Sequence, residues 1–204
     1  MARHADAMQK IILASGSERR KKLLKQIHLP FKAMIPGINE ERYPSKDPIQ
    51  MARDLALEKA KAVSEKLRPG RRKWIFGLDT VIDFHGEIIG KPKDRDDAGM
   101  ILERLSGQDH RVVTGIALIP DAIEKPIIES CISRVCFRML SAAEISLYLN
   151  TGEWREAAGA YRIQERGEFL VHSIEGSYSN IVGLPLSLLY GMLRRANYPF
   201  PAKL

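Results

Sequence analysis

The chain alternates apolar, β-prone segments with amphipathic segments of helical period along its whole length, and this alternation restricts its fold more than any other feature. The predicted strands are KIILAS, FKAMIP, WIFGLDTVIDF, HRVVTGIALIP and CISRVCFRML. Predicted helices cover residues 18–27, 49–67, 96–107 and 141–152, and a strand, a polar loop and a last helix follow. Such alternation without repeats or low-complexity stretches is typical of the α/β class.

The composition supports a folded protein with an anionic partner. A chain of 204 residues can form one domain or two small lobes with a substantial core. The 32 Lys and Arg exceed the 25 Asp and Glu, and the formal charge of +7 favours a nucleotide, a nucleic acid or a phosphometabolite. The basic cluster at 68–73 lacks interleaved aromatic residues, which favours a solvated loop over a nucleic-acid surface.

Two cysteines and the absence of long apolar runs indicate the compartment. Cys131 and Cys136 are five positions apart on a predicted strand, so their side chains point to opposite faces and a disulfide is not expected. Two thiols alone do not make a structural zinc site. No apolar run approaches the ~20 residues that cross a bilayer, and the first ten residues contain no signal-peptide core. We expect a soluble, cytoplasmic protein with reduced cysteines.

The stretch LASGSERRKKLL, residues 13–24, predicts an anion site. A short strand ends in the turn Ser15-Gly16-Ser17, and Ser17 is placed to cap the helix that follows. Arg19 and Arg20 then stand in the first turn, where the positive end of the helix dipole disfavours them. A bound anion would offset that cost, since the first N–H groups of a helix also bind anions.

Several polar residues elsewhere are candidates for chemistry. Asp79 interrupts the apolar strand FGLDTVI together with Gly77, and is either a turn-capping carboxylate or a metal ligand or general base. Lys91 in GKP and Glu40 in the acidic loop INEERYP are weaker signals, and His110 is expected to be structural. The chain has no Walker A loop, no G-x-G-x-x-G and no H-E-x-x-H.

These segments together resemble the Maf family of nucleoside triphosphate pyrophosphatases. The matching blocks are LASGSERRKKLL, LALEKA, GLDTVI, GKP, LSGQDHRVVTG, GAYRIQ and IEGSYSNIVGLPL. They occur in the family's order and run from about residue 11 to about residue 193. The resemblance implies a two-lobed α/β fold with a mixed sheet, similar to the inosine triphosphatases, with the active cleft between the lobes. It makes residues 1–204 one Maf-like domain, with 1–10 as a mobile N-terminal extension.

The resemblance also implies an activity and the residues that carry it. The family hydrolyses nucleoside triphosphates to monophosphate and pyrophosphate with a divalent metal, Mg²⁺ or Mn²⁺. Asp79 matches the proton acceptor and a metal ligand, and Glu40 matches an acidic residue near the metal. The positions expected around the triphosphate are Ser15, Arg20, Lys59 and Lys91. Three further positions match the branch that acts on dTTP and UTP: Arg19, Thr80 and Gln164.

This chain departs from the family pattern at several positions. Glu18 replaces a proline, Asn39 replaces an acidic residue, and Ala157 replaces a lysine. The other departures are Trp154, Arg162 and Glu165, which by motif order lie near the base side of the cleft. They keep open a shifted base preference, such as methylated GTP, and the family's name keeps open a non-catalytic nucleotide-binding or nucleic-acid-binding role in cell division. The resemblance further implies a homodimer, and nucleic acid is the less favoured partner.

Overall fold

The computed structural model describes residues 9–40, 45–67, 74–120 and 125–200. Two predictions fall on the remaining positions. Residues 1–8 of the expected N-terminal extension lie outside the described residues, and so does the basic cluster at 68–73.

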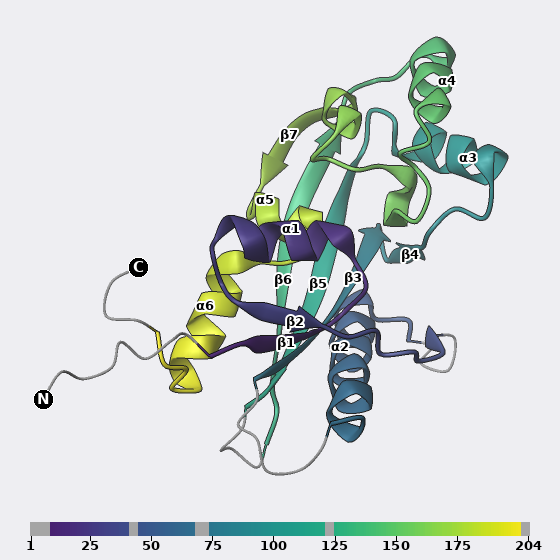
Figure 1. The fold of residues 1–204 in the computed structure, drawn as a ribbon. Coiled ribbons are helices and arrows are strands. Elements are labelled where there is room, and N and C mark those ends of the chain that lie inside the picture. The colour runs from purple at the N-terminus through teal and green to yellow at the C-terminus, as the bar shows by residue number, and fades with distance from the viewer. Residues whose placement is uncertain (1–8, 41–44, 68–73, 121–124, 201–204) are drawn as a thin grey trace, which may run out of the picture.

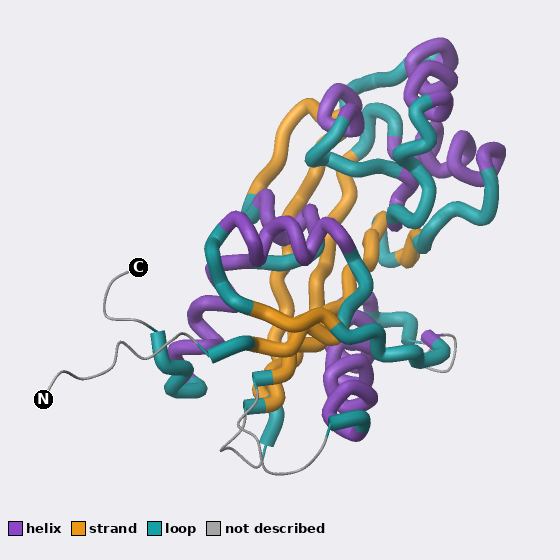
Figure 2. Tube along the Cα trace, viewed as in Figure 1, coloured by secondary structure: helices purple, strands orange, loops and turns teal. Residues whose placement is uncertain are grey.

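A seven-stranded mixed sheet forms the centre of the protein (Figures 1 and 2). The strands are β1 (Ile11–Ala14), β2 (Phe31–Ala33), β3 (Ile75–Phe84), β4 (Glu87–Ile89), β5 (Asp109–Ile119), β6 (Ile127–Phe137) and β7 (Val171–Glu175). Six of them follow the order β2-β1-β3-β5-β6-β7, and β4 pairs with β3. The pairs β2-β1 and β1-β3 are parallel, and the other pairs are antiparallel. The α/β class and the mixed sheet are therefore confirmed.

The longer helices lie where the amphipathic segments predicted them, and three short helices were not predicted. They are α1 (Glu18–Gln26), α2 (Pro48–Glu65), α3 (Arg95–Leu105), α4 (Ala142–Asn150), α5 (Tyr178–Val182) and α6 (Leu186–Arg195). Ser17 caps α1 by accepting a hydrogen bond from the Arg20 N–H, as predicted, and Ser141 forms a capping box with Glu144. The predicted polar loop before the last helix contains α5, and two short 3₁₀ helices, η2 (Ala158–Ala160) and η3 (Arg166–Leu170), were not predicted.

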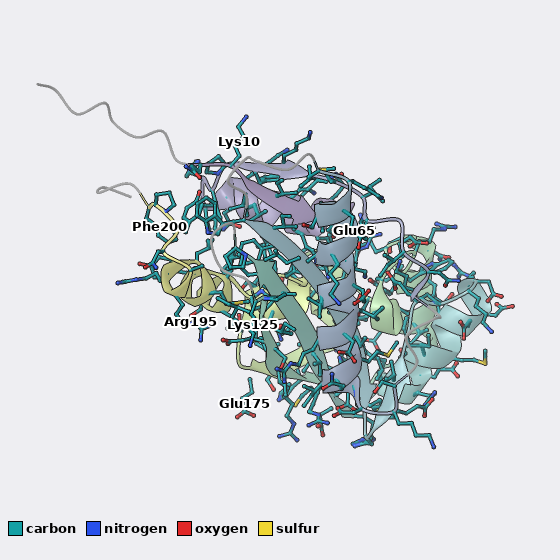
Figure 3. All side chains as sticks on the ribbon, turned by 90° about the horizontal axis from the view of Figure 1, so that it is seen from below. Lys10, Glu65, Lys125, Glu175, Arg195 and Phe200 are labelled. Carbon is teal, nitrogen blue, oxygen red and sulfur yellow. The ribbon has the colours of Figure 1, made fainter. Side chains whose placement is uncertain are left out.

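The two faces of the sheet carry different layers. On β1, Ile11 and Leu13 join the larger core, which α1 and α6 cover, whereas Ile12 and Ala14 pack under α2. Figure 3 shows α2 running along one face of the strands, with Glu65 near its end, and α6 with Arg195 across the sheet from it. Alternation along β3 thus sends odd-numbered residues toward α2 and even-numbered residues toward α1 and α6.

Two glycines let α2 approach the sheet closely. A methyl group on Gly77 would lie 1.9 Å from the Ala56 carbonyl oxygen, and one on Gly115 would lie 2.1 Å from the Ala52 carbonyl oxygen. Strand β3 runs without a break through Gly77 and Asp79, which confirms the single strand predicted over residues 74–84. The glycine serves helix packing, and the backbone of the strand stays regular.

The long strands β3, β5 and β6 connect two lobes (Figure 1). One lobe holds β1, β2, α1 and α6, and the other holds β4, α3, α4 and the segment that leads to β7. Cys131 and Cys136 are both free thiols on β6, as predicted. No helix in the described part of the chain has the length and hydropathy that a membrane span requires.

Candidate active site

A cavity of about 1170 Å³ opens where the edge of β3 is left uncovered. On this side β1 pairs with β3 only as far as Gly77, and β4 pairs with it only from Ile82. The edge between these two points belongs to Asp79 and its neighbours, which line the cavity together with residues from both lobes. The predicted cleft between the lobes therefore corresponds to a gap in the sheet edge.

Asp79 lies at the end of this cavity that faces α2. Its side chain is buried, and its Oδ1 accepts a hydrogen bond of 2.6 Å from the Lys59 ammonium on α2. The same ammonium lies 2.7 Å from the Glu40 carboxylate. Partial burial acts to raise the pKa of Glu40, but the hydrogen bond and charge of Lys59 outweigh it, so the pKa is lowered. One lysine thus pairs with two carboxylates at the cavity wall.

Arg20 organises the opposite side of β3. Its guanidinium donates to the Gly183 carbonyl at 2.8 Å, and to the hydroxyls of Ser15 and Thr80 at 3.1 Å each. Burial lowers the pKa of Arg20 to about 10, and the nearby Asp79 charge opposes that shift, so the side chain stays cationic at neutral pH. Because Asp79 and Thr80 are neighbours on a strand, they bring the α2 cluster and this cluster to one cavity from opposite faces.

A chain of hydroxyl groups fixes Thr80. Thr114 on β5 donates to the Asn180 carbonyl at 3.2 Å, so its 3.0 Å contact with Thr80 requires Thr80 to be the donor. The buried Asn180 amide in turn donates to the Val112 carbonyl and to the Ser133 hydroxyl at 3.0 Å each. Two of the motifs that identified the family in the sequence, LSGQDHRVVTG and IEGSYSNIVGLPL, therefore support the cavity through Thr114 and Asn180.

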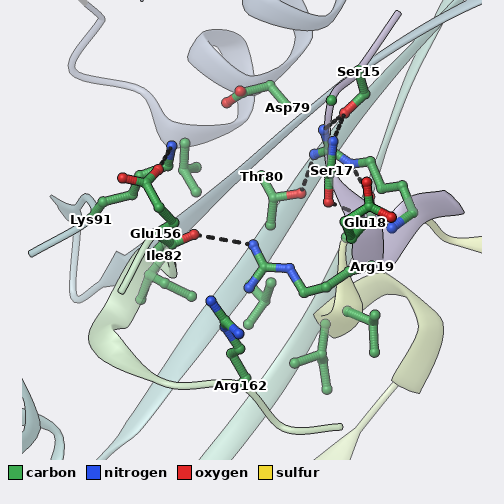
Figure 4. A pocket seen from close by; sticks show the side chains of 18 of the residues that line it. Ser15, Ser17, Glu18, Arg19, Asp79, Thr80, Ile82, Lys91, Glu156 and Arg162 are labelled. Carbon is green, nitrogen blue, oxygen red and sulfur yellow. Dashed lines mark hydrogen bonds and ion pairs between the residues drawn. The ribbon is translucent and has the colours of Figure 1, made fainter. Parts of the chain in front are cut away.

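The other end of the cavity is made by loops and by the first turn of α1 (Figure 4). Arg19 donates to the Glu156 carbonyl at a long 3.4 Å, and the Glu156 carboxylate lies 2.8 Å from the Lys91 ammonium. Glu156 has a positive φ of 56° and an exposed side chain, and the sequence analysis did not single it out. Its only sequence signal is an acidic residue two positions after Trp154.

Three departures from the family pattern were expected near this end, and two of them lie there. Arg162 and Glu165 line the cavity beside Gln164. Trp154 is buried and donates its ring N–H to the Leu149 carbonyl at 3.0 Å, and it is not among the lining residues. Placing Trp154 at the cavity by motif order was therefore wrong. Its ring fills the core beneath α4, which only the tertiary structure reveals.

The structure brings every predicted site residue to this cavity. The lining includes Ser15, Arg19, Arg20, Glu40, Lys59, Asp79, Thr80, Lys91 and Gln164. Glu18 also lines it and forms a salt bridge of 2.7 Å with Lys21, which offsets the added negative charge. His110 is buried and contacts the Tyr161 hydroxyl at 2.9 Å, in keeping with a structural role.

The donor set suits a hard divalent cation bound together with a ligand. Within the described ranges no group of three or more His, Cys, Asp or Glu side chains is arranged to hold a metal alone. Glu40 and Asp79 nevertheless converge on one point, the Lys59 ammonium. Mg²⁺ is commonly bound by one or two carboxylates plus phosphate oxygens of a substrate, and this pair fits that pattern.

Comparison with known proteins assigns the chain to a family. The sequence profile described as Maf-like protein matches residues 10–196. The chain belongs to the Maf-like protein family. A Maf-like relative from Symbiobacterium thermophilum, named dTTP/UTP pyrophosphatase, is 43% identical over 192 residues, which cover 94% of this chain and 96% of the relative. A relative of the same name from Pelotomaculum thermopropionicum is 40% identical over 191 residues, which cover 94% and 98%.

A solved structure was also compared with this Maf-like chain. The Ham1 protein of Staphylococcus aureus matches 92% of this chain and 99% of its own, with 11% identity and a TM-score of 0.49. This score is too low to support an argument about the fold. The predicted similarity to inosine triphosphatases therefore stays a prediction.

Proposed function

We propose that this protein is a nucleoside triphosphate pyrophosphatase that converts dTTP and UTP to the monophosphate and pyrophosphate. The observation that carries the proposal is the pair of carboxylates, Glu40 and Asp79, that meet at Lys59 beside the Arg20 cluster in one cavity. Two relatives of about 40% identity over nearly the whole chain are named for this activity. Cytoplasmic location and a homodimer remain part of the same proposal.

Asp79 is the proposed general base. It takes a proton from the water that attacks the α-phosphorus, the bond from that phosphorus to the bridging oxygen breaks, and pyrophosphate leaves. Lys59 orients the Asp79 carboxylate through Oδ1, and within the described part of the chain the other oxygen accepts no hydrogen bond. That second oxygen is the one available to a water.

The cationic groups stabilise the charge that develops on the leaving pyrophosphate. Arg20, Ser15 and the first N–H groups of α1 lie on one side of the cavity, and Lys91 lies on the other. A divalent cation such as Mg²⁺ or Mn²⁺, held by Glu40 and Asp79, would neutralise part of the triphosphate charge. The resting salt bridge between Lys91 and Glu156 must then open for Lys91 to reach a phosphate.

The end of the cavity lined by Arg19 and Gln164 supports recognition of a pyrimidine. We call it the base end, because the nucleobase is proposed to bind there. Gln164 offers an amide donor and an amide acceptor, which match the oxo and N–H edge of uracil or thymine. Arg19 adds further donors from α1. Thr80 is tied to Arg20 and Thr114 in this structure, so its proposed contribution is to position Arg20.

The decisive experiment measures pyrophosphate release by the purified protein with Mg²⁺ or Mn²⁺. The substrates are dTTP, UTP, CTP, GTP, ATP and methylated GTP, and we expect kcat/KM for dTTP and UTP to exceed the others. Preferred turnover of another base would keep the chemistry and replace the proposed substrate. Absence of turnover with every triphosphate and both metals would refute the proposed function.

A further inference from the structure

Arg162 stands at the base end of the cavity, where the family pattern has a glycine. Its guanidinium donates to the Arg155 carbonyl at 2.7 Å and lies 3.5 Å from the Glu165 carboxylate. Its backbone N–H donates to the Tyr148 hydroxyl at 3.1 Å. The side chain is thus held in one position by its own loop, and it lines the cavity.

Hydrogen-bond donors at this end lack acceptors. The Nε of Arg162 and the Nε2 of Gln164 are buried, and neither has a hydrogen-bond partner among the described residues. Among the described residues, the Arg19 guanidinium donates one long hydrogen bond, of 3.4 Å, to the Glu156 carbonyl. Buried donors without acceptors cost stability, and such groups require an explanation such as a missing ligand. An incoming group with acceptor oxygens would supply the missing partners.

Charge points to the same kind of ligand. Figure 4 shows the guanidinium groups of Arg19 and Arg162 directed toward one another across the cavity. Burial lowers the pKa of Arg19, and the positive charge of Arg162 lowers it further, while Glu165 and Glu156 act in the opposite direction. Two like charges kept this close favour a ligand that presents electron-rich oxygens to both.

Resting on the proposed function, we propose that Arg162 is a specificity-determining residue that donates to the 4-oxo group of a uracil or thymine base. A guanidinium has only donors, so it pairs with the oxygen at ring position 4 and not with the amino group that cytosine carries there. With cytosine, the amino group and the guanidinium are both donors, so neither would find an acceptor in this partly buried site. Leaving polar groups unpaired is the strongest way for a site to reject a close analogue. Arg162 therefore separates UTP from CTP.

The test compares Arg162→Ala and Arg162→Gln with a matched control, Arg166→Ala. Arg166 is exposed and is not among the cavity-lining residues. Steady-state kcat and KM are measured for UTP and CTP, and calorimetry measures binding of UMP and CMP, which needs no turnover. Thermal melting of each variant shows whether it folds, and Arg162→Gln carries the test if Arg162→Ala does not.

We expect Arg162→Ala to reduce the UTP-to-CTP ratio of kcat/KM by about 10- to 100-fold, mainly through UTP, since hydrogen bonds to charged groups have that strength. The UMP preference over CMP should fall in parallel. Arg162→Gln should raise kcat/KM for CTP above the wild-type value, because its amide oxygen can accept from the amino group. Arg166→Ala should keep the wild-type ratio.

Equal losses for UTP and CTP, or an unchanged ratio in Arg162→Ala, would overturn this role for Arg162 while leaving pyrophosphatase activity established. If the wild-type protein hydrolysed no triphosphate, the proposed function would fail by itself. A UMP preference that disappears in Arg162→Ala would still support base recognition in that case, and an absence of any UMP preference would overturn it.

Discussion

The two ends of the cavity are built in different ways. At the acidic end, Asp79 and Lys59 stand on a central strand and a long helix, and both are buried and paired with one another. At the base end, Arg162 and Gln164 stand on a short segment between two 3₁₀ helices, and each keeps a buried donor without a described partner. Rigid elements hold reacting groups accurately, whereas loops tolerate substitution. This difference fits the family pattern, because Asp79 and Lys59 keep it, whereas loop residues such as Asn39 and Arg162 depart from it.

The largest expected effect is the loss of kcat when Asp79 at the acidic end is replaced. Asp79→Asn keeps the shape of the side chain but removes the base, so we expect the protein to fold and kcat to fall by about 1,000-fold. Circular dichroism and pyrophosphate release measure the two quantities. Asp54→Asn is the matched control, because Asp54 is on α2 and its carboxylate accepts a hydrogen bond from Gln50, away from the cavity lining. Normal turnover by Asp79→Asn would remove Asp79 from the mechanism.

The second prediction tests the close approach of α2 to the sheet, which places Lys59 beside Asp79. Gly77→Ala would place a methyl group 1.9 Å from the Ala56 carbonyl oxygen, so α2 must move. We expect the free energy of unfolding to fall by about 3 kcal/mol, measured by urea denaturation. Gly191→Ala on α6 is the control, since no atom lies within 4 Å of the added methyl group and a helical glycine gains stability on this change. Equal stability of the two variants would contradict the packing argument.

The third prediction concerns the pH dependence of stability that arises from a buried histidine near the base end. Burial lowers the pKa of His110 to about 4, and His110 supports Tyr161, which lines the cavity. The unfolded chain takes up this proton near the ordinary histidine pKa of about 6.5, whereas the folded protein takes it up only near 4. Stability from this group is therefore complete above about pH 6.5 and is lost as the pH falls toward 4.

Urea denaturation at pH 7 and pH 4.5 measures this effect. We expect the wild-type free energy of unfolding to decrease by about 2 kcal/mol more than that of His110→Gln over this interval. Titrating carboxylates contribute equally to both proteins, so the difference isolates His110. An identical pH dependence in the two proteins would show that His110 does not carry the effect.

The smallest expected effect concerns the exposed salt bridge between Lys91 and Glu156. Glu156→Gln removes the charge that pairs with Lys91, so Lys91 becomes available to a phosphate. Because both side chains are exposed, we expect only a change of about 2-fold, seen as a lower KM for UTP with kcat unchanged. Added salt should reduce the difference between the variant and the wild type. A higher KM would mean that Glu156 assists binding.

The sequence predicted most of the helices and strands because those features depend on short-range patterns. Alternation along β3 and the helical period of α2 were visible before any contact was known, and Ser17 was recognised as a cap. The family blocks then pointed to Asp79 and Lys59. The prediction failed for Trp154, since motif order says which loop carries a residue and not which way its side chain points.

The sequence by itself determined the α/β class, the helix caps and the family, because these follow from local periodicity and from residues at fixed spacing. Only the tertiary structure decided that β1 pairs with β3 as far as Gly77 and leaves the edge of β3 open beyond it. It also decided that Arg19 and Arg162, far apart in the chain, face one another. Such contacts arise from strand pairing and loop packing between distant segments, and no local pattern encodes them.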